Sequence, residues 1–244
     1  MNSRQLDILA LLEQQGEITI KNLAEQLHVS EMTIHRDLDY LEQEQFLFKK
    51  RGAAVFINAP DRRFGMYEEE KRRIGKLAAS LIEPGQSIIF DNSTTAVITA
   101  RFLSGIPKLT FYTTNLETAQ IVSKYPDTVL YCSGGYYFPD SEGFIGPQAE
   151  AFVEKLHVDV AILGISGISL EHGLTGPYYM HTALERKIIA AAKKRIVVAD
   201  HSKFDKTAME KTADLSEIDC IVTDSGIREE TRIRYSEAVK ILIA

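Results

Sequence analysis

Residues 29–41 read VSEMTIHRDLDYL, and this stretch decides how the first part of the chain folds. Ser30 is a favourable N-cap for a helix that continues to about residue 44. The apolar side chains of that helix recur at the spacing of a single helical face: Ile34, Leu38 and Leu41. The pattern therefore predicts an amphipathic helix with one buried face.

Two more helices are predicted before it. Thr19 is a suitable N-cap for a helix over roughly 20–27, and His28-Val29 forms a tight turn into the next one. A first helix over 3–15 ends at Gly16. Its expected apolar stripe is Leu6, Leu9 and Leu12, with Ile8 and Leu11 beside them. Two helices joined by a short turn, the second capped by serine, indicate a helix-turn-helix.

Residues 46–56 add a hairpin. Two short β-like runs flank a basic tip made of Lys49, Lys50 and Arg51. The first 57 residues are therefore predicted to form a winged helix-turn-helix domain. Because outward side chains of the third helix and the tip can reach bases and phosphates, we predict binding to double-stranded DNA. The candidate DNA-binding residues are Thr19, Ser30, Glu31, Met32, Thr33, His35, Arg36, Lys49, Lys50 and Arg51.

Charge does not support this prediction by itself. The 244 residues carry a net charge of −6, and residues 1–57 hold six basic and nine acidic side chains. A winged helix used for protein contacts is the alternative, so the DNA prediction depends on where charges lie.

The remainder of the chain alternates between strand and helix patterns. After a linker over 58–67, residues 68–244 are predicted to form an effector-binding and oligomerisation domain. The expected strands are 87–90, 109–113, 128–132, 158–163, 195–199, 219–223 and 240–244. The expected helices are 68–82, 94–103, 116–124, 147–156, 181–193 and 228–239, with a long loop after Gly134-Gly135. Repeated strand–helix units with apolar strands predict a Rossmann-like parallel α/β sheet covered on both faces.

Small and hydroxyl-bearing residues follow several of these strands. Open α/β sheets bind ligands at the carboxyl ends of their strands, so this edge is the predicted ligand site. The candidates are Asp91, Ser93, Thr94, Thr95, Asn115, Gly134, Gly135, Gly164, Ser166, Gly167, Asp200 and Lys203. Lys203 is suited to a phosphate group. Taken singly, Ser93 could be only a helix cap, Gly134-Gly135 only a turn, and residues 200–204 only an exposed loop.

Other kinds of site are not expected. His172, His181 and His201 match no metal-ligand spacing, and the two cysteines, Cys132 and Cys220, lie far apart in the sequence. No phosphate-binding glycine loop is found, so no metal and no cofactor are predicted. No apolar stretch suits a membrane helix and the start lacks a secretion signal, so a cytoplasmic protein is expected.

With these motifs in place, the chain resembles the DeoR family of bacterial transcription regulators over essentially its full length. Residues 29–41 resemble the family's VS-x-x-TIRRDL-x-x-L segment. The second half matches an ordered series that usually reads D-x-G-T-T, T-N, G-G, G, G-x-x-G and D-x-S-K-F. Here that series is DNSTT (91–95), TN (114–115), GG (134–135), Gly146, GISG (164–167) and DHSKF (200–204).

The resemblance implies a regulator of sugar catabolism, usually a repressor, whose sensor domain is similar to ribose-5-phosphate isomerase and binds a phosphorylated sugar or a close relative. It implies that an anionic group is surrounded by Ser93, Thr94, Thr95, Gly134, Gly135 and Lys203. It implies that Asp91, Asn115 and Asp200 address sugar hydroxyls or shape the site.

Three positions depart from the family pattern. His35 replaces the first arginine of the usual pair, Ser93 replaces the usual glycine, and Gly52-Ala53-Ala54 replaces Gly-Gly-Ala. These changes bear on the operator sequence and on which sugar fits.

The sequence therefore predicts a non-enzymatic repressor of a carbohydrate operon, acting as a dimer or tetramer and released from DNA by an anionic sugar metabolite. Three alternatives stay open: a sugar-phosphate isomerase with a DNA-binding head, an activator, and an interaction module with a degenerate sensor.

Overall fold

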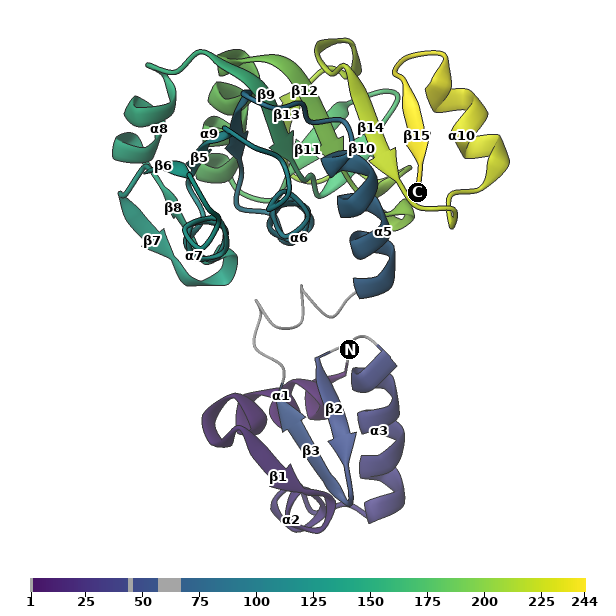
Figure 1. Cartoon of the computed structure of the whole chain (residues 1–244). Helices are drawn as coiled ribbons and strands as arrows, with labels where there is room; N and C mark the ends of the chain where they lie inside the picture. Colours follow the sequence, from purple (N-terminus) through teal and green to yellow (C-terminus); the bar gives the residue numbers. More distant parts are fainter. Residues whose placement is uncertain (1, 44–45, 57–66) are drawn as a thin grey trace. The chain divides into compact units, whose positions relative to one another are not determined.

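The computed structural model describes residues 2–43, 46–56 and 67–244. The chain divides into two compact units, Met1–Met66 and Tyr67–Ala244, which can be followed in Figure 1. The predicted linker over 58–67 lies outside the described residues except for Tyr67.

The first unit has the predicted winged helix-turn-helix architecture. Its helices are α1 (Ser3–Gln15), α2 (Ile20–Gln26) and α3 (Glu31–Gln43). Its strands are β1 (Glu17–Thr19), β2 (Leu47–Lys50) and β3 (Ala53–Phe56). The sheet order is β1-β3-β2 with antiparallel pairing, so the wing hairpin gains a third strand from between α1 and α2.

Local interactions start and stop these helices where the sequence indicates. The Thr19 hydroxyl accepts a hydrogen bond from the Asn22 amide at 3.2 Å, and the Ser30 hydroxyl accepts one from the Thr33 amide at 3.2 Å. Each bond satisfies an amide that has no partner within its helix. Gly16 ends α1 with φ +75°, a conformation that glycine adopts at little cost.

The core of this unit corrects one prediction. Ile8 and Leu12 are fully buried, whereas Leu6 is 52% exposed and Leu9 and Leu11 are only partly buried. At 3.6 residues per turn, Leu6 lies about 200° around the helix from Ile8. The buried face of α1 therefore runs through Gln5, Ile8 and Leu12, and the predicted Leu6 stripe is wrong.

The second unit is built on a seven-stranded, all-parallel sheet, as predicted. Its strands, in spatial order, are β15 (Ile241–Ile243), β14 (Cys220–Thr223), β12 (Ala192–Val198), β9 (Val158–Leu163), β4 (Ser87–Phe90), β5 (Thr110–Thr113) and β6 (Val129–Cys132). The central strand β9 is almost wholly buried, since both of its faces are covered.

Helices pack on both faces of this sheet. One apolar cluster contains residues of α5 (Glu68–Ala79), α6 (Thr94–Ala100) and α7 (Leu116–Val122). The other contains residues of α8 (Pro147–Val153), α9 (Tyr179–Ala191) and α10 (Glu229–Ser236). Among the described residues, no helix is long and apolar enough to cross a membrane.

Two smaller sheets were not predicted. A hairpin of β7 (Tyr136–Phe138) and β8 (Gly143–Ile145) occupies the expected long loop. A second sheet joins β10 (Gly167–Ser169), β11 (Gly173–Gly176) and β13 (Glu210–Ala213) in that order. All five strands have only three or four residues, which is too short for an alternating apolar pattern to stand out in the sequence. Most predicted helices are also a turn longer than those observed, as with 68–82 against Glu68–Ala79.

Candidate functional site

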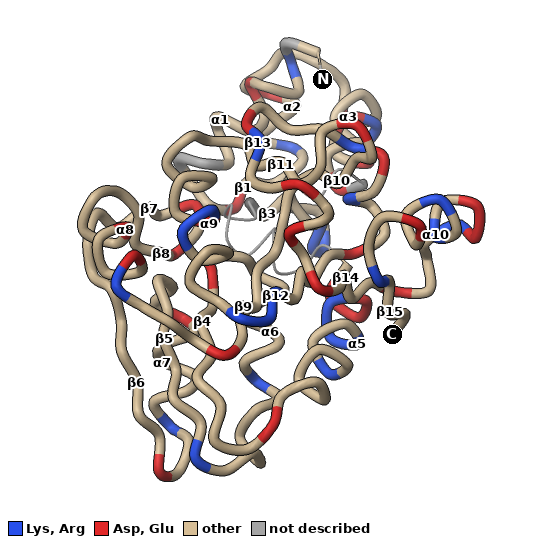
Figure 2. Tube along the Cα trace, turned by 90° about the horizontal axis from the view of Figure 1, so that it is seen from above, with Lys and Arg blue, Asp and Glu red and all other residues tan. Residues whose placement is uncertain are grey.

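The outward face of α3 carries the side chains predicted to reach DNA. Glu31, Met32, His35 and Arg36 are exposed, with Met32 65% exposed despite its apolar side chain. Thr33 is half-buried, and its hydroxyl lies 2.9 Å from that of Ser30. The hydroxyls of Thr19 and Ser30 both cap helices, so only their remaining hydrogen-bonding capacity is available to DNA. Figure 2 shows Lys and Arg interspersed with Asp and Glu along the chain, so charge alone does not mark the site.

The wing differs from its prediction at Lys49. Lys49 and Lys50 both lie in β2, but among the described residues only the ammonium of Lys49 is seen to pair with α3, with Asp39 and with Glu42 at 3.1 Å. The hydrogen bond to Asp39 raises the pKa of Lys49 and lowers that of Asp39. Lys50 and Arg51 are exposed. The phosphate-binding role predicted for the tip therefore rests on Lys50 and Arg51, while Lys49 ties the wing to α3.

Asp37 of the R-D-L segment anchors α3 to α1. Its carboxylate is buried and accepts hydrogen bonds from the side-chain nitrogen (Nε2) of Gln5 at 3.1 Å and from the Arg4 guanidinium. Because these groups come from two helices, Asp37 fixes the position of α3 within the head.

We predict that Asp37→Ala loosens the head. Gln5 and Arg4 lose their acceptor, and a lost buried hydrogen bond of this kind costs about 1–3 kcal/mol. Hydrogen exchange of the full chain should show faster exchange at the α1 amides. The exposed Asp7→Ala change on the same helix is the control and should leave the rates unchanged; equal rates in both variants would contradict the anchoring role.

In the second unit, Asp91 joins two neighbouring strands at the carboxyl edge of the sheet. One carboxylate oxygen accepts from the Ser93 amide at 3.0 Å and from its hydroxyl at 2.7 Å. The other accepts from the Gly164 amide, which follows β9, at 3.0 Å. A Cβ on Gly164 would lie 2.4 Å from the Ser93 side chain, so only glycine permits this close approach. Asp91 therefore shapes the edge.

Asn115 also has a structural use. Its side-chain oxygen caps α7 by accepting from the Thr118 amide at 2.8 Å. Its side-chain nitrogen donates to the carbonyl oxygens of Ser141 at 3.0 Å and Glu142 at 3.3 Å. The amide thus holds the turn of the β7–β8 hairpin against the end of β5. The family pattern assigns Asn115 either to sugar hydroxyls or to site shape, and this geometry favours shape.

The remaining small residues occupy neighbouring positions along the same edge. Thr94 and Thr95 are buried in the first turn of α6, whose cap Ser93 is half-buried. Gly134 and Gly135 have positive φ between β6 and β7. Gly167 packs against Thr175 and Lys206, whereas Ser166 is exposed. The strand order places the residues after β12, β9, β4 and β5 side by side.

The 200–205 segment, named the effector loop below, begins at the end of β12. Asp200 is buried and accepts hydrogen bonds from the amide and hydroxyl of Ser202. Both the amide and the Nδ1 of His201 lie 2.8 Å from the Asp224 carboxylate. Burial raises the pKa of Asp224, but its hydrogen bonds with His201 and Gly226 outweigh this and lower it. Lys203 is half-buried, and no described side chain pairs with its ammonium.

Sequence reasoning missed Glu185 on α9. Its carboxylate accepts from the Thr212 hydroxyl at 2.8 Å. Desolvation of the carboxyl group, with repulsion from Asp91, raises the pKa of Glu185 to about 8. Glu185 on α9 is therefore close enough to Asp91, at the carboxyl edge of the sheet, for the charge of one carboxylate to affect the ionisation of the other. No sequence motif marks this residue, because its shifted pKa depends on three segments that meet only in the fold.

We predict that Glu185 makes stability fall as pH rises. An unfolded glutamate ionises near 4.5, whereas the folded one keeps its proton up to about 8, so raising the pH through this window favours unfolding. Glu185→Gln should melt higher than the parent at pH 8.5 and nearly equally at pH 4.5. Each kcal/mol corresponds to about 2–4 °C in a domain of this size. The exposed Glu230→Gln is the control, and equal pH profiles for all three proteins would contradict the shift.

The two units together define a regulator with a winged helix-turn-helix head and a separate α/β sensor. Residues 4–59 match the model of the DeoR-like helix-turn-helix domain, and residues 67–225 match the DeoR C terminal sensor domain. The chain belongs to the DeoR family.

Curated relatives extend over both units. The chain is 35% identical to the HTH-type transcriptional repressor GlcR of Bacillus subtilis, over 91% of this chain and 87% of the relative. It is 32% identical to the glycerol-3-phosphate regulon repressor of Escherichia coli, over 91% and 90%. It is also 32% identical to the transcriptional repressor AccR of Agrobacterium fabrum, over 92% and 90%.

Solved structures give a more distant likeness. Ribose 5-phosphate isomerase A of Methanocaldococcus jannaschii is 19% identical, with a TM-score of 0.41 over 57% of this chain and 55% of that chain. A likeness at this level carries no functional inference.

Proposed function

We propose that this chain represses an operon for carbohydrate use and is released from its double-stranded DNA operator by a phosphorylated sugar or a similar anionic sugar metabolite. Lys203 is the observation that carries the effector part. Lys203 is half-buried as a residue and follows β12 at the carboxyl edge of a parallel sheet, and its ammonium has no side-chain partner among residues 67–244. A cation at that position suits an anionic ligand group. Relatives that are named repressors, one of them of a glycerol-3-phosphate regulon, support the proposal.

The rest of the edge completes the proposed effector site. Backbone amides and hydroxyls supply anion contacts at Ser93, Thr94, Thr95, Gly134 and Gly135. Gly164 and Gly167 let Ser93 and Thr175 approach closely, and the exposed Ser166 between them supplies a further hydroxyl to the ligand. Asp91 and Asn115 hold these segments in place through the hydrogen bonds described above. Asp200 does the same within the effector loop.

On the DNA side, one chain presents a single recognition helix, α3. Useful affinity therefore needs a homodimer or a tetramer that reads paired half-sites, assembled mainly through residues 68–244. We expect the protein to act in the cytoplasm, with no cofactor.

The contact between Tyr67 and His201 offers a route from effector to head. Tyr67 is the first residue of the second unit, and its ring meets that of His201 edge-on at 5.1 Å. His201 lies in the effector loop, two residues before Lys203. A ligand that favours one arrangement of this loop would thereby change which conformation Tyr67, at the start of the sensor unit, prefers.

We predict that Tyr67→Leu uncouples the two activities. Operator affinity and sugar-phosphate affinity should each change less than about twofold, while the effect of the sugar phosphate on operator affinity falls several-fold. Fluorescence anisotropy with a labelled operator, with and without the sugar phosphate, measures this. Tyr131→Leu is the control, because it removes a comparable ring contact with Tyr112 at 5.0 Å. Full coupling in Tyr67→Leu would contradict the route.

Thermal-shift screening tests the proposed effector class. The panel contains ribose 5-phosphate, glucose 6-phosphate, fructose 1,6-bisphosphate and glycerol 3-phosphate, with the free sugars, sulfonated analogues and inorganic phosphate as comparisons. A ligand at 100 times its dissociation constant stabilises the folded state by about 2.7 kcal/mol. We expect a phosphorylated member to raise the melting temperature and its free sugar to fail. Shifts with free sugars only would overturn the anionic effector.

The alternative is a sugar-phosphate isomerase that carries a DNA-binding head. Such an enzyme needs an available acid–base carboxylate near the substrate. Both carboxylate oxygens of Asp91 accept hydrogen bonds from the protein, which favours a structural role over acid–base catalysis. The isomerase alternative would instead depend on Glu185, whose raised pKa of about 8 suits proton transfer near neutral pH. Turnover assays with pentose and hexose phosphates should show no conversion. Deleting the gene distinguishes a repressor from an activator: transcription of the operon rises if the chain is a repressor and falls if it is an activator.

A further inference from the structure

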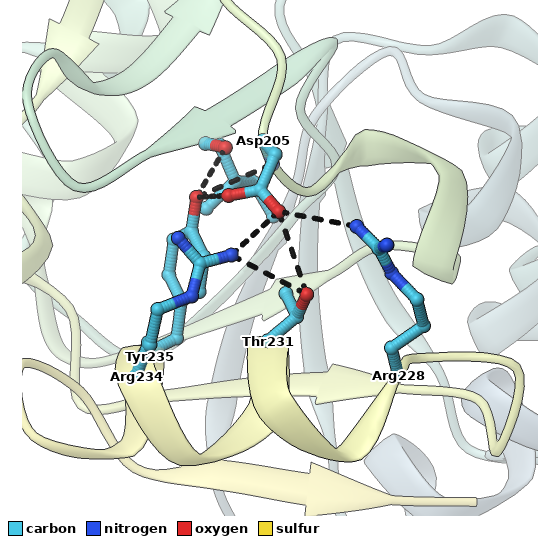
Figure 3. A network of polar contacts seen from close by, with 6 residues as sticks. Asp205, Arg228, Thr231, Arg234 and Tyr235 are labelled. Atoms are coloured by element: carbon cyan, nitrogen blue, oxygen red, sulfur yellow. Dashed lines mark hydrogen bonds and ion pairs between the residues drawn. The ribbon is translucent and has the colours of Figure 1, made fainter.

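A fully buried tyrosine bridges two segments of the proposed effector site. Tyr235 on α10 is 0% exposed, and its hydroxyl donates to the carbonyl of Ile168 at 3.0 Å. The same hydroxyl oxygen accepts from the Asp205 amide at 3.2 Å and lies 3.1 Å from the Asp205 Oδ1, a second acceptor for its proton, as Figure 3 shows. Ile168 follows the Gly164–Gly167 segment, and Asp205 ends the effector loop. One hydroxyl thus links the segments that follow β9 and β12.

Residues in and next to α10 also contact the side-chain carboxylate of Asp205 in the effector loop. Arg234 lies 2.8 Å from the Asp205 carboxylate, the Thr231 hydroxyl 3.4 Å and Arg228 3.9 Å (Figure 3). The two arginine contacts lie at the surface, where single ion pairs contribute little, and the contact of the buried Thr231 is long for a hydrogen bond. The Tyr235 hydroxyl is buried, so its loss leaves the Asp205 amide without that acceptor. The buried contact is therefore the stronger part of this attachment.

The Tyr235 ring supports the loop from the same side. It packs edge-on against Phe204 at 5.1 Å between ring centres. Phe204 directly follows Lys203 and forms a β-bridge with Ile168. Lys203 is thus next in sequence to a residue, Phe204, whose position Tyr235 fixes. Tyr235 makes this contact from a distant part of the chain, 30 residues beyond Asp205.

We propose that Tyr235 is a positioning residue of the effector site, setting the spacing between residues 164–169 and the effector loop so that Lys203 meets the anionic group. This rests on the proposed function. It extends the site to α10, an element that none of the sequence motifs includes.

The test compares two tyrosine-to-phenylalanine changes in the full chain. Tyr235→Phe removes the bridging hydroxyl and keeps the ring. Tyr125→Phe is the matched control, since its hydroxyl also donates to a backbone carbonyl, that of Ala100 at 2.7 Å, away from the effector loop. Both variants should lose stability. Without ligand, hydrogen exchange should quicken at 164–169 and 200–206 only in Tyr235→Phe.

The second measurement is affinity for the panel's best sugar phosphate by calorimetry. Tyr235→Phe should bind about tenfold more weakly, and Tyr125→Phe as the parent does. Unchanged exchange in both segments, or equal affinity losses in the two variants, would overturn the positioning role. If the parent binds no sugar phosphate, the proposed function fails, while the exchange result still decides whether Tyr235 sets the loop.

Discussion

Lys203→Ala is expected to give a repressor that binds its operator normally and is poorly released by effector. The ammonium carries a charge opposite to that of the proposed anionic ligand. A charge-assisted hydrogen bond contributes about 1.5–3 kcal/mol, so sugar-phosphate affinity should fall by about tenfold to a hundredfold. Calorimetry with the sugar phosphate that stabilises the parent, and operator release by the same compound, measure the two effects.

Lys206→Ala is the matched control for this prediction. Lys206 is exposed, lies three residues further along, and its side chain has no partner among the described residues. It removes the same charge from the same region without touching the proposed anion contact. Normal release of Lys203→Ala, or equal losses in both variants, would refute the assignment of Lys203.

Arg36→Ala is expected to weaken operator binding while leaving sugar-phosphate binding intact. Arg36 is exposed on α3, and a base or phosphate contact of this kind contributes about 1–3 kcal/mol. A dimer loses the contact twice. Anisotropy titrations at several salt concentrations also show which contact it is. If Arg36 contacts a phosphate, its loss makes operator affinity less dependent on salt, whereas loss of a base contact relaxes the sequence preference at one position.

The control for Arg36 is Arg73→Ala on α5, which removes an exposed arginine, paired with Glu70, from the sensor unit. Its operator affinity at fixed salt should equal that of the parent. Unchanged affinity in Arg36→Ala would mean that the exposed face of α3 does not read the operator.

Features governed by local chemistry could be predicted from the sequence. The caps at Thr19, Ser30 and Ser93 form where serine and threonine precede apolar helical repeats. The nearly continuous apolar run at 158–163 correctly predicted the buried strand β9, because a strand covered on both faces needs apolar side chains throughout. The repeated strand–helix units also predicted a parallel sheet correctly, whereas the order of its strands came only from the structure.

Features that depend on contacts between distant segments could not be predicted. Lys49 was expected at the wing tip, because sequence does not show that Asp39 and Glu42 on α3 face it. The hydrogen bond from the Gly164 amide to Asp91 could not be predicted either, because it joins residues 73 positions apart. The β10-β11-β13 sheet was not predicted, because its strands of three or four residues show no alternation of apolar and polar side chains.

The roles of Glu185 and Tyr235 also emerge only in three dimensions. Glu185 acquires its raised pKa from burial beside Thr212 and from the charge of Asp91. Tyr235 lies in a helix whose sequence reads as an ordinary charged surface, yet its hydroxyl reaches Ile168. Neither residue type nor spacing distinguishes them from other helical residues.

The most direct measurement is the affinity of the full chain for an operator selected from random duplexes, at fixed salt, as the panel's best sugar phosphate is added. Operator affinity should fall and level off, and the bound operator should weaken sugar-phosphate binding by the same factor, because linkage is reciprocal. Operator affinity that stays constant while the sugar phosphate saturates its site would contradict the claim that this sensor controls this head.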